Sequence, residues 1–273
     1  MRKTEMRNPA TMHIDRMSGA ELAQVMQAEN YNAVKALDAA LPAIAQAIDA
    51  VAERMQKGGR LFYVGCGTSG RLGVLDASEC PPTYGVSKET VIGVIAGGDT
   101  ALRNAVEGVE DDAEAGRRDL AAWELTENDS VMGISAAGGA QYVLGALAYA
   151  AERGALTIGL SSTEGSELLR RAEIAILTDT GAEVVTGSTR MKAGTAHKLV
   201  LNMLSTGVMV KCGYVYENMM INLRPSNKKL TLRMAGIVHE MTGAAEDEAL
   251  SYLEQAGWDI RTAVKMIRSK SNG

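Results

Sequence analysis

The chain has 273 residues, which suits one large domain or one domain with a small appendage. A net charge of −5 and an aromatic content of 4% argue against a nucleic-acid-binding protein, which needs a basic surface and rings for stacking. Three widely spaced cysteines suit neither a disulfide framework nor a zinc site. We therefore expect reduced thiols, a cytoplasmic location and no metal. Because the N-terminus runs straight into charged residues and no apolar run reaches membrane-spanning length, we expect neither a signal peptide nor a membrane span.

The first part of the chain predicts an arm followed by helices. Residues 1–17 are polar and are typical of an extended arm or loop. Ser18, with Glu21 three residues later, forms a capping-box pattern that begins a helix. Apolar residues at helical spacing then predict helices over 19–30 and 32–57.

Beyond this region, short apolar runs bounded by glycine or polar residues alternate with helical patterns. This alternation predicts a doubly wound, parallel α/β sheet. In such sheets ligands bind at the carboxyl ends of the strands, and three of these ends carry glycine with Ser, Thr or Asp. The expected strands are 60–64, 91–95, 130–134, 156–160 and 174–177, and the expected helices are 100–122, 141–152, 192–213 and 226–241.

The tail differs in character from the rest of the chain. Two short amphipathic patterns, 246–256 and 260–267, predict a small helical subdomain. We therefore expect three parts. They are the arm and N-terminal helices over 1–57, the sheet domain over 58–225 and a helical C-terminal region over 226–273.

The first motif is Gly65-Cys-Gly-Thr-Ser-Gly-Arg71, directly after the first expected strand. It matches the dinucleotide pattern G-x-G-x-x-G, but that site also needs an acidic residue at the end of the second strand, and Asp99 comes too late. The hydroxyls of Thr68 and Ser69, with the N–H groups of the next helix, suit a terminal phosphate. A phosphomonoester site is favoured over a dinucleotide site and over a structural turn.

Two acidic segments supply candidate acids and bases. Glu79 stands just before a rigid double proline, where it could serve as a general acid or base, and the alternative is a surface glutamate in a turn. The run 107–114 contains four acidic residues besides Glu110, and such a run is usually a solvated helix face. Periodicity does not indicate which of its members points inward.

A fourth segment, 186–196, places hydroxyl, glycine and cationic residues before a long apolar helix. This pattern suits an anionic or polyol ligand at a helix N-terminus. The alternative is helix capping alone, which needs one hydroxyl where the segment offers several.

Together these segments resemble the N-acetylmuramic acid 6-phosphate etherase family of sugar isomerase (SIS) domain proteins. The resemblance covers nearly the whole chain and is most specific over 63–84, 96–112 and 187–207, while the tail 243–268 is similar to the family's ubiquitin-associated-like end. It implies a homodimer with a SIS-type doubly wound parallel five-stranded sheet flanked by helices. N-terminal helices and a small C-terminal helical subdomain complete the expected fold.

The resemblance also implies an activity. The family is a lyase that cleaves the D-lactyl ether of N-acetylmuramic acid 6-phosphate, in amino-sugar recycling, with no metal or organic cofactor. Its proton-donor glutamate corresponds to Glu79 and its second catalytic glutamate to Glu110. These carboxylates need opposite protonation states, so we expect Glu79 to be partly buried. The expected partner is a phosphorylated amino sugar, with no nucleic acid and no membrane.

One loop departs from the family pattern. Where relatives often carry Ser-Gly-Arg-Thr-Pro, this chain has Ala-Gly-Gly-Ala-Gln over 137–141, so a guanidinium and two hydroxyls are missing. Backbone N–H groups of a glycine nest, with Ser135 and Ser161, could bind the anion instead. Two alternatives therefore stay open, a non-catalytic sugar-phosphate sensor and an aldose–ketose isomerase. The predicted substrate-binding residues are Gly67, Thr68, Ser69, Gly70, Arg71, Ser135, Gly138, Gly139, Ser188, Thr189 and Lys192.

Overall fold

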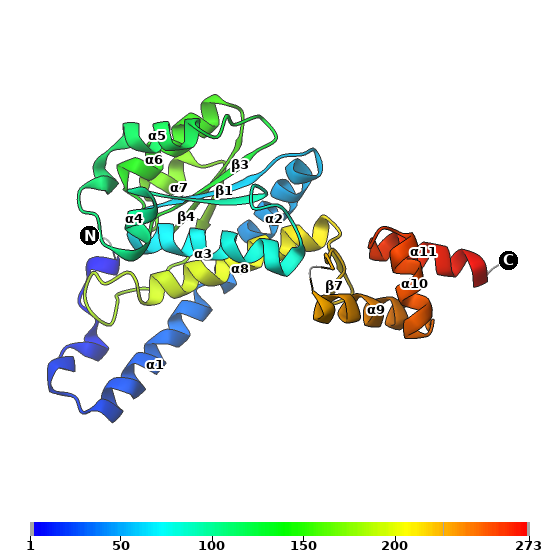
Figure 1. The fold of residues 1–273 in the computed structure, drawn as a ribbon. Helices are drawn as coiled ribbons and strands as arrows, with labels where there is room; N and C mark the ends of the chain where they lie inside the picture. The colour runs from blue at the N-terminus through cyan, green and yellow to red at the C-terminus, as the bar shows by residue number, and fades with distance from the viewer. Residues whose placement is uncertain (1–2, 226, 272–273) are drawn as a thin grey trace. The chain divides into compact units, whose positions relative to one another are not determined.

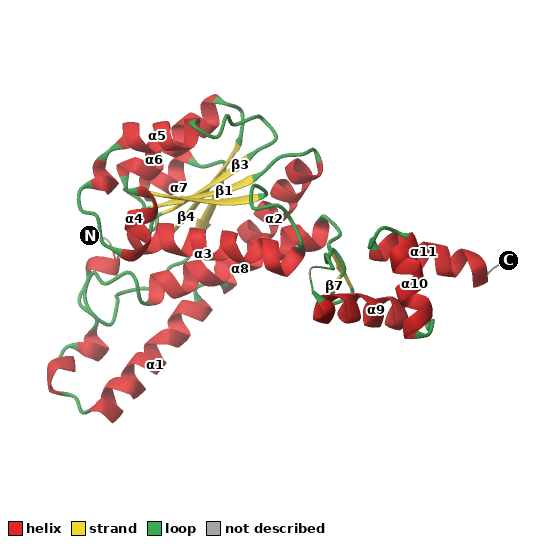
Figure 2. Cartoon of the chain, viewed as in Figure 1, coloured by secondary structure: helices red, strands yellow, loops and turns green. Residues whose placement is uncertain are grey.

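The computed structural model describes residues 3–225 and 227–271 and confirms the α/β class, with a five-stranded parallel sheet flanked by helices (Figures 1 and 2). The strand order is β2-β1-β3-β4-β5, so the chain reverses direction across the sheet between β1 and β3. This is the topological switch point at which doubly wound sheets bind ligands. The strands are β1 (Leu61–Gly65), β2 (Val91–Ile95), β3 (Ser130–Ile134), β4 (Leu156–Ser161) and β5 (Ile174–Leu177).

Helices cover both faces of the sheet, which explains why its strands are continuous apolar runs. In Figure 1, α5, α6 and α7 lie on one face and α3 and α8 on the other. Phe62 and Val64 of β1 join the core beneath α6, whereas Tyr63 points the opposite way and donates a hydrogen bond to Asp76 of α3 at 3.0 Å. The helices of this part are α1 (Gly19–Lys35), α2 (Leu41–Gln56), α3 (Gly67–Tyr84), α4 (Gly98–Arg103), α5 (Ala113–Ala121), α6 (Gln141–Glu152), α7 (Glu167–Arg171) and α8 (Lys192–Lys211).

Several predicted boundaries are wrong for local reasons. The helix expected over 32–57 is broken, because α1 continues to Lys35 and α2 starts afresh at Leu41 with a proline in its first turn. The helix expected over 100–122 is broken too, because Gly108 takes a left-handed conformation before the 3-10 turn η5 (Val109–Asp111). The double proline, expected to make its segment rigid, lies within the last part of α3.

The chain forms two compact units. The larger consists of residues 1–78 and 88–208 and contains the sheet, and the smaller consists of 79–87 and 209–273. The smaller unit has its own core, built mainly by α9 (Lys228–Thr242), α10 (Glu246–Gln255) and α11 (Ile260–Ser271), beside the two-stranded β6 (Val215–Tyr216) and β7 (Met219–Met220). The domain boundaries expected after residues 57 and 225 stay a prediction.

Within residues 3–225 and 227–271, no helix has both the length and the apolar character that crossing a membrane demands.

Candidate functional site

The predicted phosphate motif forms a very tight strand-to-helix turn. A Cβ atom on Gly65 would lie 2.6 Å from the backbone nitrogen of Gly70, and one on Gly70 would lie 2.5 Å from the carbonyl oxygen of Gly65. The two glycines therefore let β1 run almost directly into α3, which begins at Gly67. Thr68 and Ser69 then lie in the first helical turn, where unpaired N–H groups and the helix dipole attract an anion.

A cavity of about 230 Å³ lies beside this turn, at the carboxyl ends of β1 and β3. It brings together six of the predicted site residues from four separate segments, namely Gly67, Thr68, Ser69, Glu110, Ser135 and Thr189. The remaining lining residues are Cys66, Ile134, Ala136, Ala137, Ala140, Gly194 and His197. The site thus combines a helix N-terminus, several hydroxyls and one carboxylate, which suits a polar anionic ligand.

The fold selects Glu110 from its acidic run. Val109 packs against the hydrophobic core and fixes η5, and the adjacent Glu110 lines the cavity. Asp112 is used elsewhere, since its carboxylate accepts the Ala115 N–H at 2.9 Å and caps α5. Close by, burial above all, and then the charges of Glu110 and Asp111, raise the pKa of the Cys66 thiol to about 12. Cys66 therefore lines the cavity as a neutral thiol.

His197 is a site residue that the sequence reasoning missed. It is buried on α8, and its Nε2 lies 3.1 Å from the Ser162 hydroxyl, which is 3.0 Å from the Thr178 hydroxyl. Burial lowers the pKa of His197 to about 4, so the imidazole is neutral at physiological pH. Its spacing of three residues from Gly194 places both on one helix face, and that signal could have pointed to it.

The loop after β3 differs from the predicted anion nest. The Gly138 N–H already donates to the Ser135 side chain at 3.1 Å and to its carbonyl at 3.0 Å, so it is not free for an anion. Neither Gly138 nor Gly139 lines the cavity, where Ala137 and Ala140 present methyl groups instead. Ser161 also lies outside, with its hydroxyl donating to the Ala136 carbonyl at 3.1 Å.

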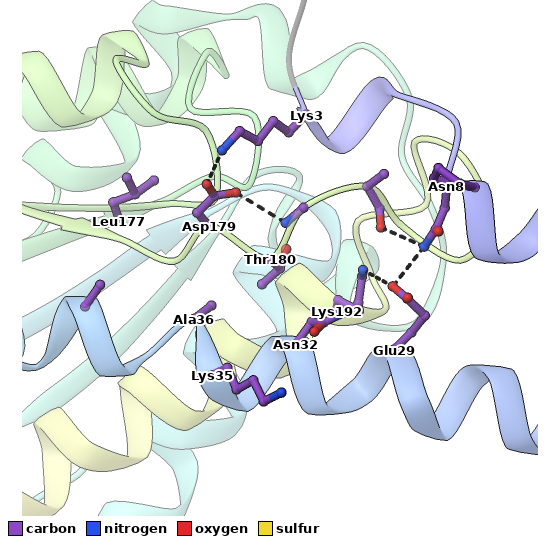
Figure 3. A pocket seen from close by; sticks show the side chains of 14 residues that line it. Lys3, Asn8, Glu29, Asn32, Lys35, Ala36, Leu177, Asp179, Thr180 and Lys192 are labelled. Atoms are coloured by element: carbon purple, nitrogen blue, oxygen red, sulfur yellow. Dashed lines mark hydrogen bonds and ion pairs between the residues drawn. The ribbon is translucent and has the colours of Figure 1, made fainter.

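Both predicted cationic ligands lie outside the cavity. The Arg71 guanidinium donates to the carbonyls of Leu102 at 3.0 Å and Asn104 at 3.4 Å, so it fastens α3 to the end of α4. The buried Lys192 ammonium pairs with Glu29 of α1 (Figure 3). These contacts are the physical reason why neither cation reaches the cavity.

The N-terminus of α8 is occupied by the protein itself. Glu183 accepts the N–H groups of Lys192 and Ala193, each at 3.0 Å, and so occupies the place of the ligand predicted there. Ser188 and Gly70 do not line the cavity either. Lys192 instead borders a second cavity of about 620 Å³, between the N-terminal arm, α1 and the end of β5 (Figure 3).

Glu79 is not among the described residues that line the cavity. It lies on α3 ten residues after Ser69, which corresponds to roughly 15 Å along the helix axis. The side chain is exposed, so the expectation of a partly buried carboxylate is wrong for the isolated chain. The reason is helical geometry, because three turns of α3 separate Glu79 from the phosphate motif.

The described residues contain no group of three or more His, Cys, Asp or Glu side chains placed to hold a metal ion.

Comparisons with known proteins show which sequences this chain is similar to. Residues 43–151 match the glucokinase regulatory protein N-terminal SIS domain, 105–207 match the SIS domain and 239–266 match a UBA-like domain. The chain is 53% identical to an N-acetylmuramic acid 6-phosphate etherase from Caldanaerobacter subterraneus, over 97% of this chain and 86% of that protein. It is 51% identical to one from Serratia proteamaculans, over 97% and 89%.

Solved structures support the fold. A Bacteroides fragilis protein, described as a phosphosugar isomerase involved in capsule formation, matches with a TM-score of 0.55 and 19% identity, over 75% of this chain and 98% of that one. A phosphoheptose isomerase from Francisella tularensis matches with a TM-score of 0.52 and 19% identity, over 70% and 98%. At this level of identity the similarity concerns the arrangement of the sheet and its helices.

Proposed function

The chain belongs to the N-acetylmuramic acid 6-phosphate etherase family, and from this premise we propose that it is a carbon–oxygen lyase acting on that sugar phosphate. It cleaves the D-lactyl ether at C3 and releases N-acetylglucosamine 6-phosphate and D-lactate. The observation that carries the proposal most directly is that relatives 53% and 51% identical over 97% of this chain bear that name. In addition, Glu110 lines a cavity beside a phosphate-type turn.

The phosphate binds at the start of α3. The first-turn N–H groups and the hydroxyls of Thr68 and Ser69 meet it from one side, and the hydroxyls of Ser135 and Thr189 extend the site. The lining residues that the structure describes include no lysine or arginine. Binding therefore depends on neutral hydrogen-bond donors and on the dipole of α3.

Glu110 acts as the base and Glu79 as the acid. Ring opening exposes an aldehyde that acidifies the proton on C2, and the Glu110 carboxylate removes this proton. The C3–oxygen bond then breaks, a C2–C3 double bond forms, and Glu79 donates a proton to the departing lactate oxygen. Addition of water across the double bond restores the C2 proton and places a hydroxyl on C3, which gives N-acetylglucosamine 6-phosphate.

Glu79 comes from a second copy of the chain. Its position roughly 15 Å along α3 from Ser69 separates it from the phosphate motif of its own chain. The cavity of about 230 Å³ is also smaller than the roughly 300–1,000 Å³ of typical ligand pockets. A homodimer in which each chain lends Glu79 to its partner's cavity accounts for both observations.

A cytoplasmic role in recycling cell-wall amino sugars follows from this substrate. Cys66, Cys80 and Cys212 form no disulfide bond, in keeping with a reducing compartment.

The decisive experiment is to incubate the protein with N-acetylmuramic acid 6-phosphate and measure D-lactate. Glu79→Gln and Glu110→Gln should each reduce the rate by roughly 10²–10⁴-fold, the usual contribution of a general acid or base. In D₂O, the Glu79→Gln variant should still exchange the C2 proton, because its base remains, whereas Glu110→Gln should not. Wild-type protein that binds the sugar without releasing lactate would favour a sensor, and interconversion of aldose and ketose would favour an isomerase.

A further inference from the structure

His197 is a buried group that the proposed mechanism does not use. It lines the cavity from α8, and the residue is only 1% exposed to solvent. Nε2 bonds to Ser162, which lies outside the cavity lining. Of the two ring nitrogens, Nδ1 is therefore the one left for a ligand, and among the described residues it has no hydrogen-bond partner.

The hydrogen-bond chain from Thr178 through Ser162 to His197 fixes the tautomer. If Nε2 carried the proton, Ser162 would have to donate to Thr178, and the fully buried Thr178 hydroxyl would have no acceptor in the described part of the chain. A buried O–H without an acceptor is costly. In the opposite direction Thr178 donates to Ser162 and Ser162 donates to Nε2, so each proton has an acceptor. The proton of the neutral ring then lies on Nδ1.

We propose that His197 is a substrate-binding residue that donates a hydrogen bond from Nδ1 to a phosphate oxygen of the ligand in this cavity. The inference rests on the proposed function, because it assigns a role within the same phosphate site. Three observations support it: the Nδ1–H has no acceptor among the described residues, the cavity is lined by neutral donors, and none of the described lining residues is a lysine or arginine. His197 thus supplies a donor in a cavity where Ala137 and Ala140, from the loop after β3, present only methyl groups.

The His197 imidazole donates this hydrogen bond in its neutral form. Burial lowers the pKa of His197 to about 4, and the other titratable groups lining the cavity are Cys66 and Glu110. The imidazole therefore stays neutral from about pH 6 upward, and its contribution to affinity should not vary with pH there.

The test compares two substitutions by calorimetric titration with N-acetylglucosamine 6-phosphate and with unphosphorylated N-acetylglucosamine. His197→Gln keeps an amide near Nε2 but removes the Nδ1 donor, and it should weaken binding of the phosphorylated sugar by roughly 10–100-fold, as expected for one hydrogen bond to a charged group. His197→Asn places an amide N–H near Nδ1 and should recover part of the loss. Equal weakening for both sugars, or wild-type affinity in His197→Gln, would overturn the proposal.

Two further measurements test the proposal without relying on the reaction, and the first of them needs no variant. Long-range ¹H–¹⁵N correlation spectra of the wild-type protein report the tautomer directly, and an Nε2-protonated ring would contradict the proposal. The ratio of wild-type to His197→Gln affinity should stay constant between pH 6 and 8.5, whereas a cationic histidine would make it rise as the pH falls. If the protein releases no D-lactate but these results hold, the proposed function fails and the phosphate contact stands.

Discussion

At the scale of single residues, the loop after β3 depends on one glycine. Gly138 has a φ of +65°, and a Cβ atom there would lie 2.3 Å from the Ser166 hydroxyl and 2.4 Å from the Ser166 Cβ. The same residue donates to Ser135, whose side chain lines the cavity. The absence of a side chain at position 138 therefore holds Ser135 in the site, although Gly138 itself lies outside it.

Gly138→Ala should destabilise the protein more than a left-handed alanine alone explains. Gly165→Ala is the matched control, because Gly165 has a φ of +62° but nothing within 4 Å of an added Cβ. The control should cost about 1–2 kcal/mol, the penalty of the left-handed conformation, and Gly138→Ala should cost about 1–3 kcal/mol more because of overpacking. Urea unfolding of both variants checks this, and equal losses would show that Ser166 moves aside freely.

At the scale of elements, a buried ion pair fixes how β1 and β3 begin. Asp129 precedes β3 and accepts hydrogen bonds from the Arg60 backbone at 2.8 Å, from Arg60 Nη2 at 2.9 Å and from the Thr126 N–H at 2.8 Å. Burial by itself would raise the pKa of Asp129, but these hydrogen bonds hold it below its ordinary value of 3.8. The pair thereby sets the register of the two strands that flank the switch point.

Asp129→Asn should lower the free energy of unfolding by about 2–4 kcal/mol at pH 7, since it leaves the Arg60 charge without its partner. Because the folded-state pKa of Asp129 is lowered, its stabilising contribution is complete above the unfolded-state pKa and is lost as the pH falls through the folded-state value. The difference between variant and wild type should therefore shrink below about pH 4. Urea titrations at pH 7 and pH 3.5 measure it.

Glu152→Gln provides the control, because Glu152 pairs with Arg117 on the surface. Its loss should be at most about 1 kcal/mol. A loss as large as that of Asp129→Asn would contradict the argument that burial makes the Arg60–Asp129 pair important.

At the scale of the whole molecule, the proposed site needs two chains. Glu110 lines a cavity, while Glu79 lies three helical turns from the phosphate motif on an exposed part of α3. The helical rise of about 1.5 Å per residue sets that separation along α3. The proposed function therefore makes assembly a condition of activity.

Mixing the two inactive variants tests this arrangement. In a heterodimer of Glu79→Gln and Glu110→Gln chains, one cavity receives both substitutions and the other receives wild-type Glu79 and Glu110. If subunits exchange, the mixture should regain up to about a quarter of the wild-type rate of D-lactate release, since about half the dimers are mixed and each has one intact site. Sedimentation should give twice the chain mass of 28.9 kDa. A mixture as inactive as its components, despite proven exchange, would place both glutamates in one chain.

The amino-acid sequence by itself determined the features encoded by neighbouring residues. Apolar runs defined β2, β3 and β5 to the residue, and glycines with Thr68 and Ser69 marked the phosphate turn. Resemblance to relatives selected Glu110 from its acidic run. These signals are local, because strand periodicity, helix starts and motif spacing depend on residues within a few positions of one another.

Only the tertiary structure decided which side chains are free to meet a ligand. The sequence predicted Lys192 as a phosphate ligand, but it pairs with Glu29, 163 residues away in the sequence. Arg71, also predicted as a ligand, is held by a carbonyl at the end of α4. His197 is held in the site by a hydrogen bond to Ser162, which is bonded in turn to Thr178, and these two residues follow two other strands. Such long-range hydrogen bonds and burial form only in the folded chain, so local sequence patterns could not reveal them.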